Sequence, residues 1–379
     1  MENKEIYVGR GLPQMREELI EFLNLCFGFD GKEKDFIKLL PKLYKEQYCP
    51  CEHNYVVMED QEIKSAIGVY SRELSVCGER ISLHGVGNVA VHPDSRSKGY
   101  MKRLLSLAVD DMIKSGADMS DLGGLRQRYQ YFSYEPVGTK LLFEITENNM
   151  RHCFGDSPLK PFIFEEITED CPYLDDIVAL HESAPFYSKR AKEDFVDIAR
   201  SWEVKPWLIR ENDRFVGYFI DDVAELRLVN REDFNDFIRN YVAERGRIML
   251  QLPIYDIDLI EKAYKIYESV SVSADQSYTI FNFEKVIRAF LKLKTSYSSL
   301  PDGELVVCIN GVAGKENIKI CVRNNAISVL STDQIPGIIL EHKEAVSYFF
   351  GAISPQRAKN PYANSWFPLP LCLCSADHV

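Results

Sequence analysis

The chain has 379 residues, of which 46% are hydrophobic and 27% charged, and its formal net charge is −12 at pH 7. This composition is typical of a folded globular protein with about two or three domains. An acidic chain lacks the basic face that nonspecific nucleic-acid binding requires, so we expect no nucleic-acid partner. An acidic surface would instead attract cationic substrates such as amines.

The sequence also gives no sign of a membrane span or of secretion. No apolar run approaches the roughly 20 residues that cross a bilayer, and the first five residues are polar rather than signal-like. Ten cysteines are scattered along the chain. Two Cys-x-Cys pairs, Cys49/Cys51 and Cys372/Cys374, lack the spacing of a zinc half-site. We therefore expect a cytoplasmic protein with reduced thiols and no bound metal.

The first 150 residues follow an α/β order. Apolar spacing predicts helices over residues 17–27 and 36–45, and a longer helix that begins at Gly99 and ends near Gly116. Strands are expected over residues 54–59, 63–76, 81–91 and 118–122.

A basic loop joins the third of these strands to the long helix. Val89, Ala90 and Val91 end the buried strand, and Arg96, Ser97, Lys98 and Gly99 stand where the helix begins. Free backbone N–H groups and the positive end of the helix dipole meet at such a place, where pyrophosphate and other anions bind. A glycine there has no Cβ to hold a phosphate away from the backbone. The sequence therefore predicts an anion site in this loop.

Another glycine pattern lies just before this loop. Residues 85–90, Gly-Val-Gly-Asn-Val-Ala, match the dinucleotide fingerprint G-x-G-x-x-A. That fingerprint has to open a helix, whereas here it runs into the strand that ends at Val91. We predict that these residues do not bind a nucleotide.

Residues 160–290 repeat the first pattern without its basic loop. A hairpin is expected from residues 207–210 and 215–220, followed by a helix over 231–243 and a strand over 248–252. This order indicates a degenerate second copy of the first domain.

The character of the sequence changes near residue 290. Short strands are expected over residues 305–309, 318–322 and 326–330, with turns at Asn310-Gly311 and Asn324-Asn325. A helix is expected over 335–350, after Pro336. The apolar tail from Trp366 onward should pack into the body of the protein, since such a tail is too apolar to be disordered.

The basic loop resembles the acyl-CoA motif of the GNAT acetyltransferases, Gln/Arg-x-x-Gly-x-Gly/Ala, with Met101 in place of the final small residue. The resemblance implies that acetyl-CoA is the cosubstrate, with its pantetheine on the strand and its pyrophosphate on the loop. The cofactor-binding residues that it implies are Val89, Ala90, Val91, Arg96, Ser97, Lys98, Gly99, Tyr100 and Met101.

The whole chain resembles the Eis (enhanced intracellular survival) family. This resemblance implies an α+β / α/β fold with two GNAT-like mixed-sheet domains in tandem and a sterol-carrier-protein-like α/β domain. The implied boundaries are 1–155 for the acetyltransferase domain, 156–290 for the degenerate copy, and 291–379 for the last domain, whose tail reaches the active site. It also implies a homo-oligomer, commonly a hexamer in that family.

Two catalytic groups follow from the same resemblance. Tyr129, Phe132, Tyr134 and Pro136 are similar to the family's Tyr-x-x-Phe-x-Tyr-x-Pro run. The first tyrosine of that run is the general acid that protonates the departing thiolate, which implies this role for Tyr129, with Tyr131 as a rival. A phenol suits the role because its pKa near 10 roughly matches that of an alkyl thiol. The family's general base is its terminal α-carboxylate, which here belongs to Val379, whereas the family often ends in Phe.

The expected function is therefore direct acetyl transfer to a primary amine of an aminoglycoside, a polyamine or a lysine-type acceptor. His84 and His92 flank the strand and either assist proton transfer or are structural. One alternative is a non-catalytic CoA- or lipid-binding regulatory protein on the same scaffold. The other is an acyltransferase for aminoacyl or longer acyl groups.

Overall fold

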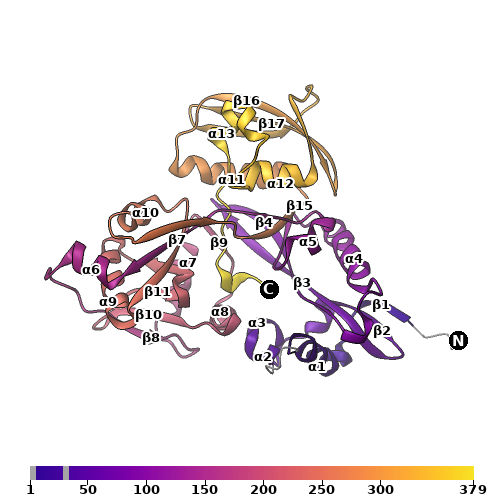
Figure 1. Cartoon of the computed structure of the whole chain (residues 1–379), viewed down its shortest axis with the longest axis horizontal. Coiled ribbons are helices and arrows are strands. Elements are labelled where there is room, and N and C mark those ends of the chain that lie inside the picture. Colours follow the sequence, from indigo (N-terminus) through magenta and orange to yellow (C-terminus); the bar gives the residue numbers. More distant parts are fainter. Residues whose placement is uncertain (1–5, 29–33) are drawn as a thin grey trace.

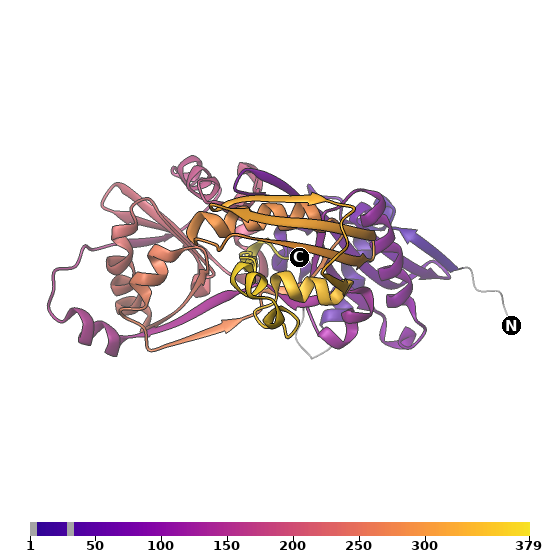
Figure 2. The same ribbon diagram turned by 90° about the horizontal axis from the view of Figure 1, so that it is seen from above.

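The computed structural model describes residues 6–28 and 34–379 and shows three sheet-containing parts. In Figure 1, the N-terminal part lies at the lower right, the middle part at the lower left, and the C-terminal part above them. The last residues descend from the upper part and end between the two lower ones, and the C-terminus again lies centrally when the molecule is seen from above (Figure 2).

The first sheet contains every strand that the sequence predicts for this region. Its order is β1-β2-β3-β4-β5-β15-β6, with β9 paired to β3. The strands are β1 (Ile6–Arg10), β2 (Asn54–Glu59), β3 (Glu62–Val76), β4 (Glu79–Val91), β5 (Met119–Leu122), β6 (Glu135–Val137), β9 (Phe186–Ser188) and β15 (Gln276–Ile280). Neighbouring strands are antiparallel except β4 and β5, which run parallel.

Helices cover both faces of this sheet. On one face α4 (Tyr100–Lys114) buries Leu104, Leu105 and Ala108 against β2, β3 and β4, as its apolar spacing predicts. On the other lies α1 (Arg16–Phe27). The single helix predicted over 36–45 is wrong. Two short helices, α2 (Phe36–Leu39) and α3 (Pro41–Tyr44), replace it because Pro41 disfavours a helical conformation at the preceding residue.

The middle part contains a four-stranded sheet, β12-β11-β10-β8, and a three-stranded sheet, β13-β7-β14. The predicted hairpin, helix and strand are all present, as β10–β11, α9 and β13. The strands are β7 (Lys140–Thr146), β8 (Ile163–Glu166), β10 (Pro206–Glu211), β11 (Arg214–Ile220), β12 (Glu225–Leu228), β13 (Arg247–Pro253) and β14 (Ser269–Ser273). The helices are α6 (Glu147–Phe154), α7 (Leu174–Glu182), α8 (Phe195–Ala199), α9 (Phe234–Arg245) and α10 (Ile257–Ala263).

The two lower parts exchange strands. The segment β5-β15-β6 of the first sheet has the same layout as β13-β7-β14, but each central strand comes from the chain segment of the other part. Residues from both sides of the expected boundary 155/156 thus contribute to each of these sheets, and α11 (Phe283–Tyr297) spans residues 290 and 291.

The upper part is a sheet of order β18-β17-β16-β19 with helices on its lower face (Figure 1). Its elements are β16 (Gly303–Gly311), β17 (Gly314–Arg323), β18 (Ala326–Ser331), β19 (Ile338–Glu341), α12 (His342–Phe350) and α13 (Pro361–Trp366). The turn at Asn324-Asn325 is confirmed, with φ of 50° and 62°. The turn predicted at Asn310-Gly311 is wrong, because β16 continues to Gly311.

The helix predicted over 335–350 is only half right. Residues 338–341 form β19, which runs parallel to β16, and α12 begins at His342. The β-branched Ile338 and Ile339 fit a pleated sheet better than a helix. Glu341 then caps the helix together with Glu344.

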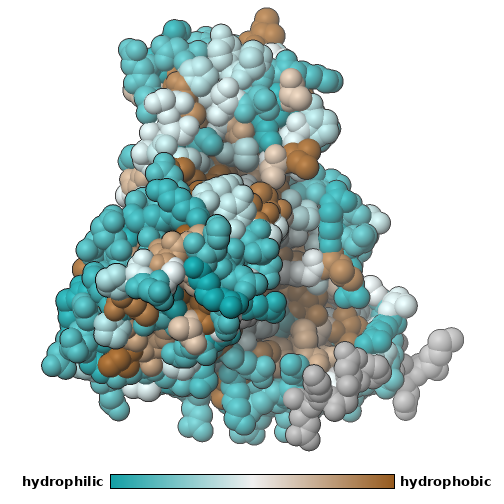
Figure 3. All heavy atoms as spheres, turned by 60° about the vertical axis from the view of Figure 1, so that its left-hand side comes forward, coloured by the Kyte–Doolittle hydropathy of each residue, from teal (hydrophilic) through white to brown (hydrophobic). Residues whose placement is uncertain are grey.

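The three parts share buried surfaces. One apolar cluster joins Leu83 of β4 and Tyr278 of β15 to Phe290 of α11 and Val307 of β16. Figure 3 shows a largely hydrophilic outer face, with hydrophobic residues gathered where the upper part meets the lower ones. Within the described residues, no helix has the length and apolar character that crossing a bilayer requires.

Candidate active site

Strands β4 and β5 separate before β4 ends. Their parallel pairing stops at Val86 and Leu122, whereas β4 continues to Val91 and pairs there only with β3 among the described strands. The backbone of residues 89–91 therefore presents an edge that no strand covers, and an extended ligand can hydrogen-bond to such an edge.

The basic loop leads directly from this open edge into α4. Residues 96–99 are exposed, and Gly99 is the N-cap of the helix, with φ of +79°. A Cβ at Gly99 would have open space around it, so the glycine is required by its backbone conformation rather than by crowding. The start of α4 is thus accessible to solvent, as the predicted anion site requires.

Three of the expected cofactor-binding residues have side chains directed elsewhere. The Lys98 ammonium lies 3.0 Å from both carboxylate oxygens of the buried Glu59, and the Tyr100 hydroxyl also donates to Glu59. Met101 is half-buried against the apolar cluster under α4. A core-facing Met is thus compatible with this loop, and Lys98 and Tyr100 offer a ligand mainly their backbone N–H groups.

The aromatic run after β5 divides into residues with different surroundings. Tyr129, at the end of α5 (Arg126–Tyr129), is only 6% exposed, whereas its rival Tyr131 is 80% exposed. The Tyr129 ring approaches to 3.0 Å from where a Cβ on Gly124 would lie, just after β5. Burial raises the pKa of Tyr129. Tyr134 is fully buried and its hydroxyl lies 2.7 Å from Ser120 Oγ, a structural contact.

The C-terminus lies on β4, at the glycines that resemble a nucleotide fingerprint. A Cβ on Gly85 would lie 2.5 Å from Val379 Cγ2, and a Cβ on Gly87 would lie 2.7 Å from the Val379 carboxylate carbon. Val86, between them, packs under α4, so the two glycines face the opposite side of the sheet. These glycines stand inside a strand, which confirms that they do not form a nucleotide loop, and they leave room for the chain end.

Charged residues that the sequence analysis missed surround this end. His378 Nδ1 lies 2.7 Å from Asp121 Oδ2, and Arg72 donates to Asp121 Oδ1 at 2.5 Å. Burial alone would lower the pKa of His378, but Asp121 and Asp275 outweigh it and raise the pKa to about 9. Burial works against ionisation of Asp121, yet Arg72 and His378 lower its pKa to about 2. Both groups are therefore charged at neutral pH.

This pair predicts a pH-dependent stability. The pKa of His378 is raised from 6.5 to about 9, so its contribution is complete below pH 6.5 and is lost as the pH rises through 9. A shift of this size corresponds to about 3 kcal/mol. We expect the difference in free energy of unfolding between wild type and His378→Gln to shrink by about 3 kcal/mol between about pH 6 and about pH 9.5 in urea titrations. A difference that does not change with pH would contradict the assignment.

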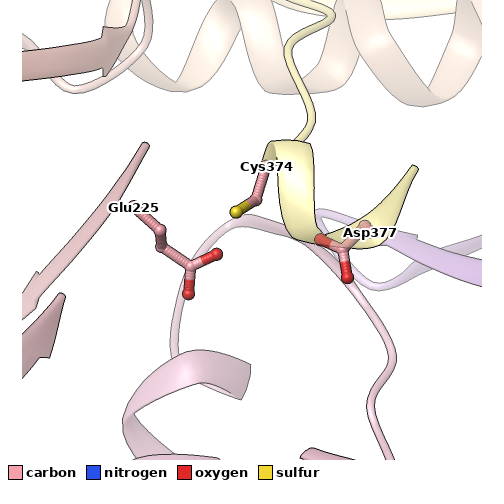
Figure 4. Close-up of side chains that lie close together, drawn as sticks. All are labelled: Glu225, Cys374 and Asp377. Carbon is pink, nitrogen blue, oxygen red and sulfur yellow. The ribbon is translucent and has the colours of Figure 1, made fainter. Parts of the chain in front are cut away.

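A second buried ionic cluster surrounds Arg190. Its guanidinium binds both oxygens of Asp377 at 2.8 Å and reaches Glu225 at 2.8 and 3.3 Å. Figure 4 shows Cys374 and Asp377 on the C-terminal turn and Glu225 approaching from β12. The potential ligand atoms of these three residues lie within 4.8 Å of one another. Because Arg190 already pairs with both carboxylates, the cluster is an ion-pair network.

A cavity of about 190 Å³ opens beside Val379. Its polar lining includes Lys42, His53, Tyr70, Arg72, Asp194 and the chain end itself. Burial, with Arg72 nearby, lowers the pKa of Lys42 to about 7.

The two histidines in and just after β4 have structural surroundings. His92 accepts a hydrogen bond from the backbone N–H of Asp94 and so caps the loop. Burial and nearby arginines lower the pKa of His84.

The missed residues have no common sequence pattern. His378 and Asp377 stand in a short polar end after an apolar tail, which was the one available signal that this end is buried. Asp121 and Arg72 lie on strands and meet the tail only through tertiary contacts. None of the ten cysteines, all of them among the described residues, forms a disulfide.

Comparison with known proteins agrees with this geometry. Residues 13–137 match the model of the acetyltransferase (GNAT) domain. The chain therefore contains a GNAT acetyltransferase domain, a domain of enzymes that transfer acyl groups. No curated protein sequence matches the chain.

Solved structures resemble nearly the whole chain in fold. A GCN5-related N-acetyltransferase from Anabaena variabilis ATCC 29413 has a TM-score of 0.67 at 14% identity and covers 97% of this chain and 99% of its own. A probable N-acyltransferase of unknown function from Enterococcus faecalis V583 has a TM-score of 0.69 at 12% identity, with 98% and 99% covered. Eis1 from Mycobacterium abscessus has a TM-score of 0.63 at 15% identity, with 97% and 99% covered.

Proposed function

We propose that this protein transfers an acetyl group from acetyl-CoA directly to a primary amine. One observation supports the proposal most strongly. The terminal residue Val379 lies on β4 at Gly85 and Gly87, where that strand parts from β5, and the Tyr129 ring lies beside Gly124, just after β5. The solved structures of similar fold include N-acetyltransferases and Eis1, and they support an Eis-like arrangement of the chain.

In this proposal, acetyl-CoA binds along the open edge and the basic loop. The backbone of Val89, Ala90 and Val91 hydrogen-bonds to the pantetheine and polarises the thioester carbonyl, as preorganised N–H donors do in oxyanion holes. The N–H groups of residues 97–101 at the start of α4 bind the pyrophosphate, and Arg96 adds positive charge. The cosubstrate thus approaches from the side of α4.

The acceptor approaches from the opposite face through the cavity beside Val379. The amine nitrogen attacks the carbonyl carbon, a C–N bond forms and the C–S bond breaks. A proton leaves the nitrogen for the Val379 carboxylate, and the Tyr129 hydroxyl gives its proton to the departing sulfur. The carboxylate proton returns to the phenolate through solvent. Holding both reactants in one ternary complex supplies much of the rate acceleration.

A thiol-release assay tests the proposal. Purified protein is mixed with acetyl-CoA and a panel of aminoglycosides, polyamines and lysine derivatives, and free CoA is measured with a thiol reagent. Amine-dependent release, with an acetylated amine found by mass spectrometry, is the expected result. CoA binding without release for every amine would favour the regulatory-protein alternative. Competition between acetyl-CoA and longer acyl-CoAs tests the other alternative.

Charge reversal in the loop is a further prediction. Arg96→Glu is expected to raise the KM for acetyl-CoA about tenfold, because it removes one charge-assisted contact to the pyrophosphate and adds a repulsive charge. The kcat at saturating acetyl-CoA should change little. Lys114→Glu, at the far end of α4, is the matched control. An equal KM in the two variants would exclude Arg96 from the cofactor site.

We also propose a cytoplasmic homo-oligomer with a C-terminal part of the sterol-carrier-protein type. Resemblance to the Eis family supports the oligomer and the type of the last domain. Light scattering coupled to size exclusion measures the oligomer, and a monomer at micromolar concentration would remove that part of the proposal.

A further inference from the structure

The last turn of the chain is anchored at Ala376, Asp377 and His378. Lys42 Nζ, from α3, donates to the backbone oxygens of Ala376 at 2.5 Å and His378 at 2.6 Å. Trp202 Nε1, from the middle part, donates to the same His378 oxygen at 3.2 Å. These contacts fix the backbone on either side of Asp377.

Two side chains of the turn are held as firmly as its backbone. Asp377 forms a bidentate pair with Arg190, which is fully buried and also pairs with Glu225. His378 lies between Asp121, at 2.7 Å, and Asp275, whose carboxylate is 3.8 Å from Nε2. The anchors come from the first sheet, the middle part and the helices near the N-terminus, so the turn is fixed from several directions.

Stability alone does not account for this arrangement. Burying ions costs several kcal/mol each, and apolar packing of similar volume often stabilises a protein as much or more. A chain end left in solvent would also avoid the entropy cost of being ordered. What the network adds is a defined position for Val379, whose carboxylate carbon would lie 2.7 Å from a Cβ on Gly87.

We propose that Lys42, Arg190 and His378 are positioning residues that hold the terminal carboxylate of Val379 against Gly87, at the acceptor side of the active site. This inference rests on the proposed function for its kinetic consequence. The contacts set the orientation of the base toward the amine. They leave the acetyl-CoA side of β4 untouched, because α4 and the loop lie on the other face.

The position of the chain end can be measured without activity. Wild type and the variants Lys42→Met, Arg190→Gln and His378→Gln are treated with a carboxypeptidase, and loss of Val379 is followed by intact mass. Lys285→Met is the matched control, because it removes a 2.6 Å ion pair to the buried Asp118 away from the tail. Release in the three variants is expected to be at least about tenfold faster than in wild type and control, since proteolysis follows the open fraction.

Kinetics give the second readout. The variants should lose at least about tenfold in kcat with the amine, or gain as much in amine KM, while the KM for acetyl-CoA stays within about twofold of wild type. Release rates equal to the control, or faster release with unchanged amine kinetics, would overturn the proposal. If wild type acetylates no amine, the proposed function fails, and the carboxypeptidase rates still decide whether these residues hold the chain end.

Discussion

Replacing Tyr129 by Phe is expected to lower kcat by at least about 100-fold, the usual contribution of a positioned general acid. The phenol is only 6% exposed and its ring lies beside Gly124, just after β5, so water has little access to take over as the acid within the transfer step. The Phe ring fills the same space, and the KM for acetyl-CoA should therefore change little. Steady-state thiol release with varied acetyl-CoA and a saturating amine measures both constants.

The control for this variant is Tyr131→Phe. Tyr131 is 80% exposed, so removing its hydroxyl should leave kcat within about twofold of wild type.

The ionisation of Tyr129 gives a further check. Burial raises its pKa, so the acid stays protonated and the alkaline limb of the rate should lie above the ordinary tyrosine range near 10. Full activity of Tyr129→Phe, or a large loss of activity in Tyr131→Phe, would contradict the assignment of Tyr129 as the general acid.

Neutralising the terminal carboxylate is expected to have an effect of similar size. A chain made by ligation that ends in Val379 carboxamide differs from wild type in one functional group and keeps the side chain that packs on Gly85. Without a carboxylate, the amine loses its proton acceptor, and kcat should fall by at least about 100-fold. Acetyl-CoA binding, measured by calorimetry, should be unchanged, because we propose that the cosubstrate binds on the other side of β4, toward α4.

Extending the chain tests the same group by a different route. Two or more residues added after Val379 convert its carboxylate to an amide and would extend into the cavity proposed for the acceptor, so activity should be lost as in the carboxamide. The same tag at the N-terminus is the control. A fully active C-terminal tag would mean that the carboxylate takes no part in the reaction.

The regular elements near the cofactor loop could be predicted because their signals are local. Alternating apolar residues define β3 and β4, and the spacing of Leu104, Leu105 and Ala108 defines α4. The two wrongly predicted helices, over residues 36–45 and 335–350, also have local causes. Pro41 interrupts one predicted helix, and Ile338 and Ile339 prefer pairing with β16 to continuing a helix. In both places the apolar spacing indicates a helix, but the type of residue at these positions favours another conformation.

The acceptor side of the site could not be predicted in the same way. In the sequence, Gly85 and Gly87 match only a nucleotide motif in the wrong context, and the structure shows that they leave room for Val379. Asp121 reads as an ordinary strand residue until His378, from the far end of the chain, forms a pair with it. The exchange that places β7 in the middle part and β15 in the first sheet could not be predicted either, because strand pairing depends on contacts between residues distant in sequence.

The sequence by itself thus determined the basic loop, its helix, the tyrosine run and an apolar tail, since each depends on the order of neighbouring residues. Only the tertiary structure decided where the tail ends, which charged groups hold it, and that Tyr131 is exposed while Tyr129 is buried. The physical reason is the range of the interactions. Backbone conformation and amphipathic spacing act over a few residues, whereas buried ion pairs and close approaches join residues that only folding brings together.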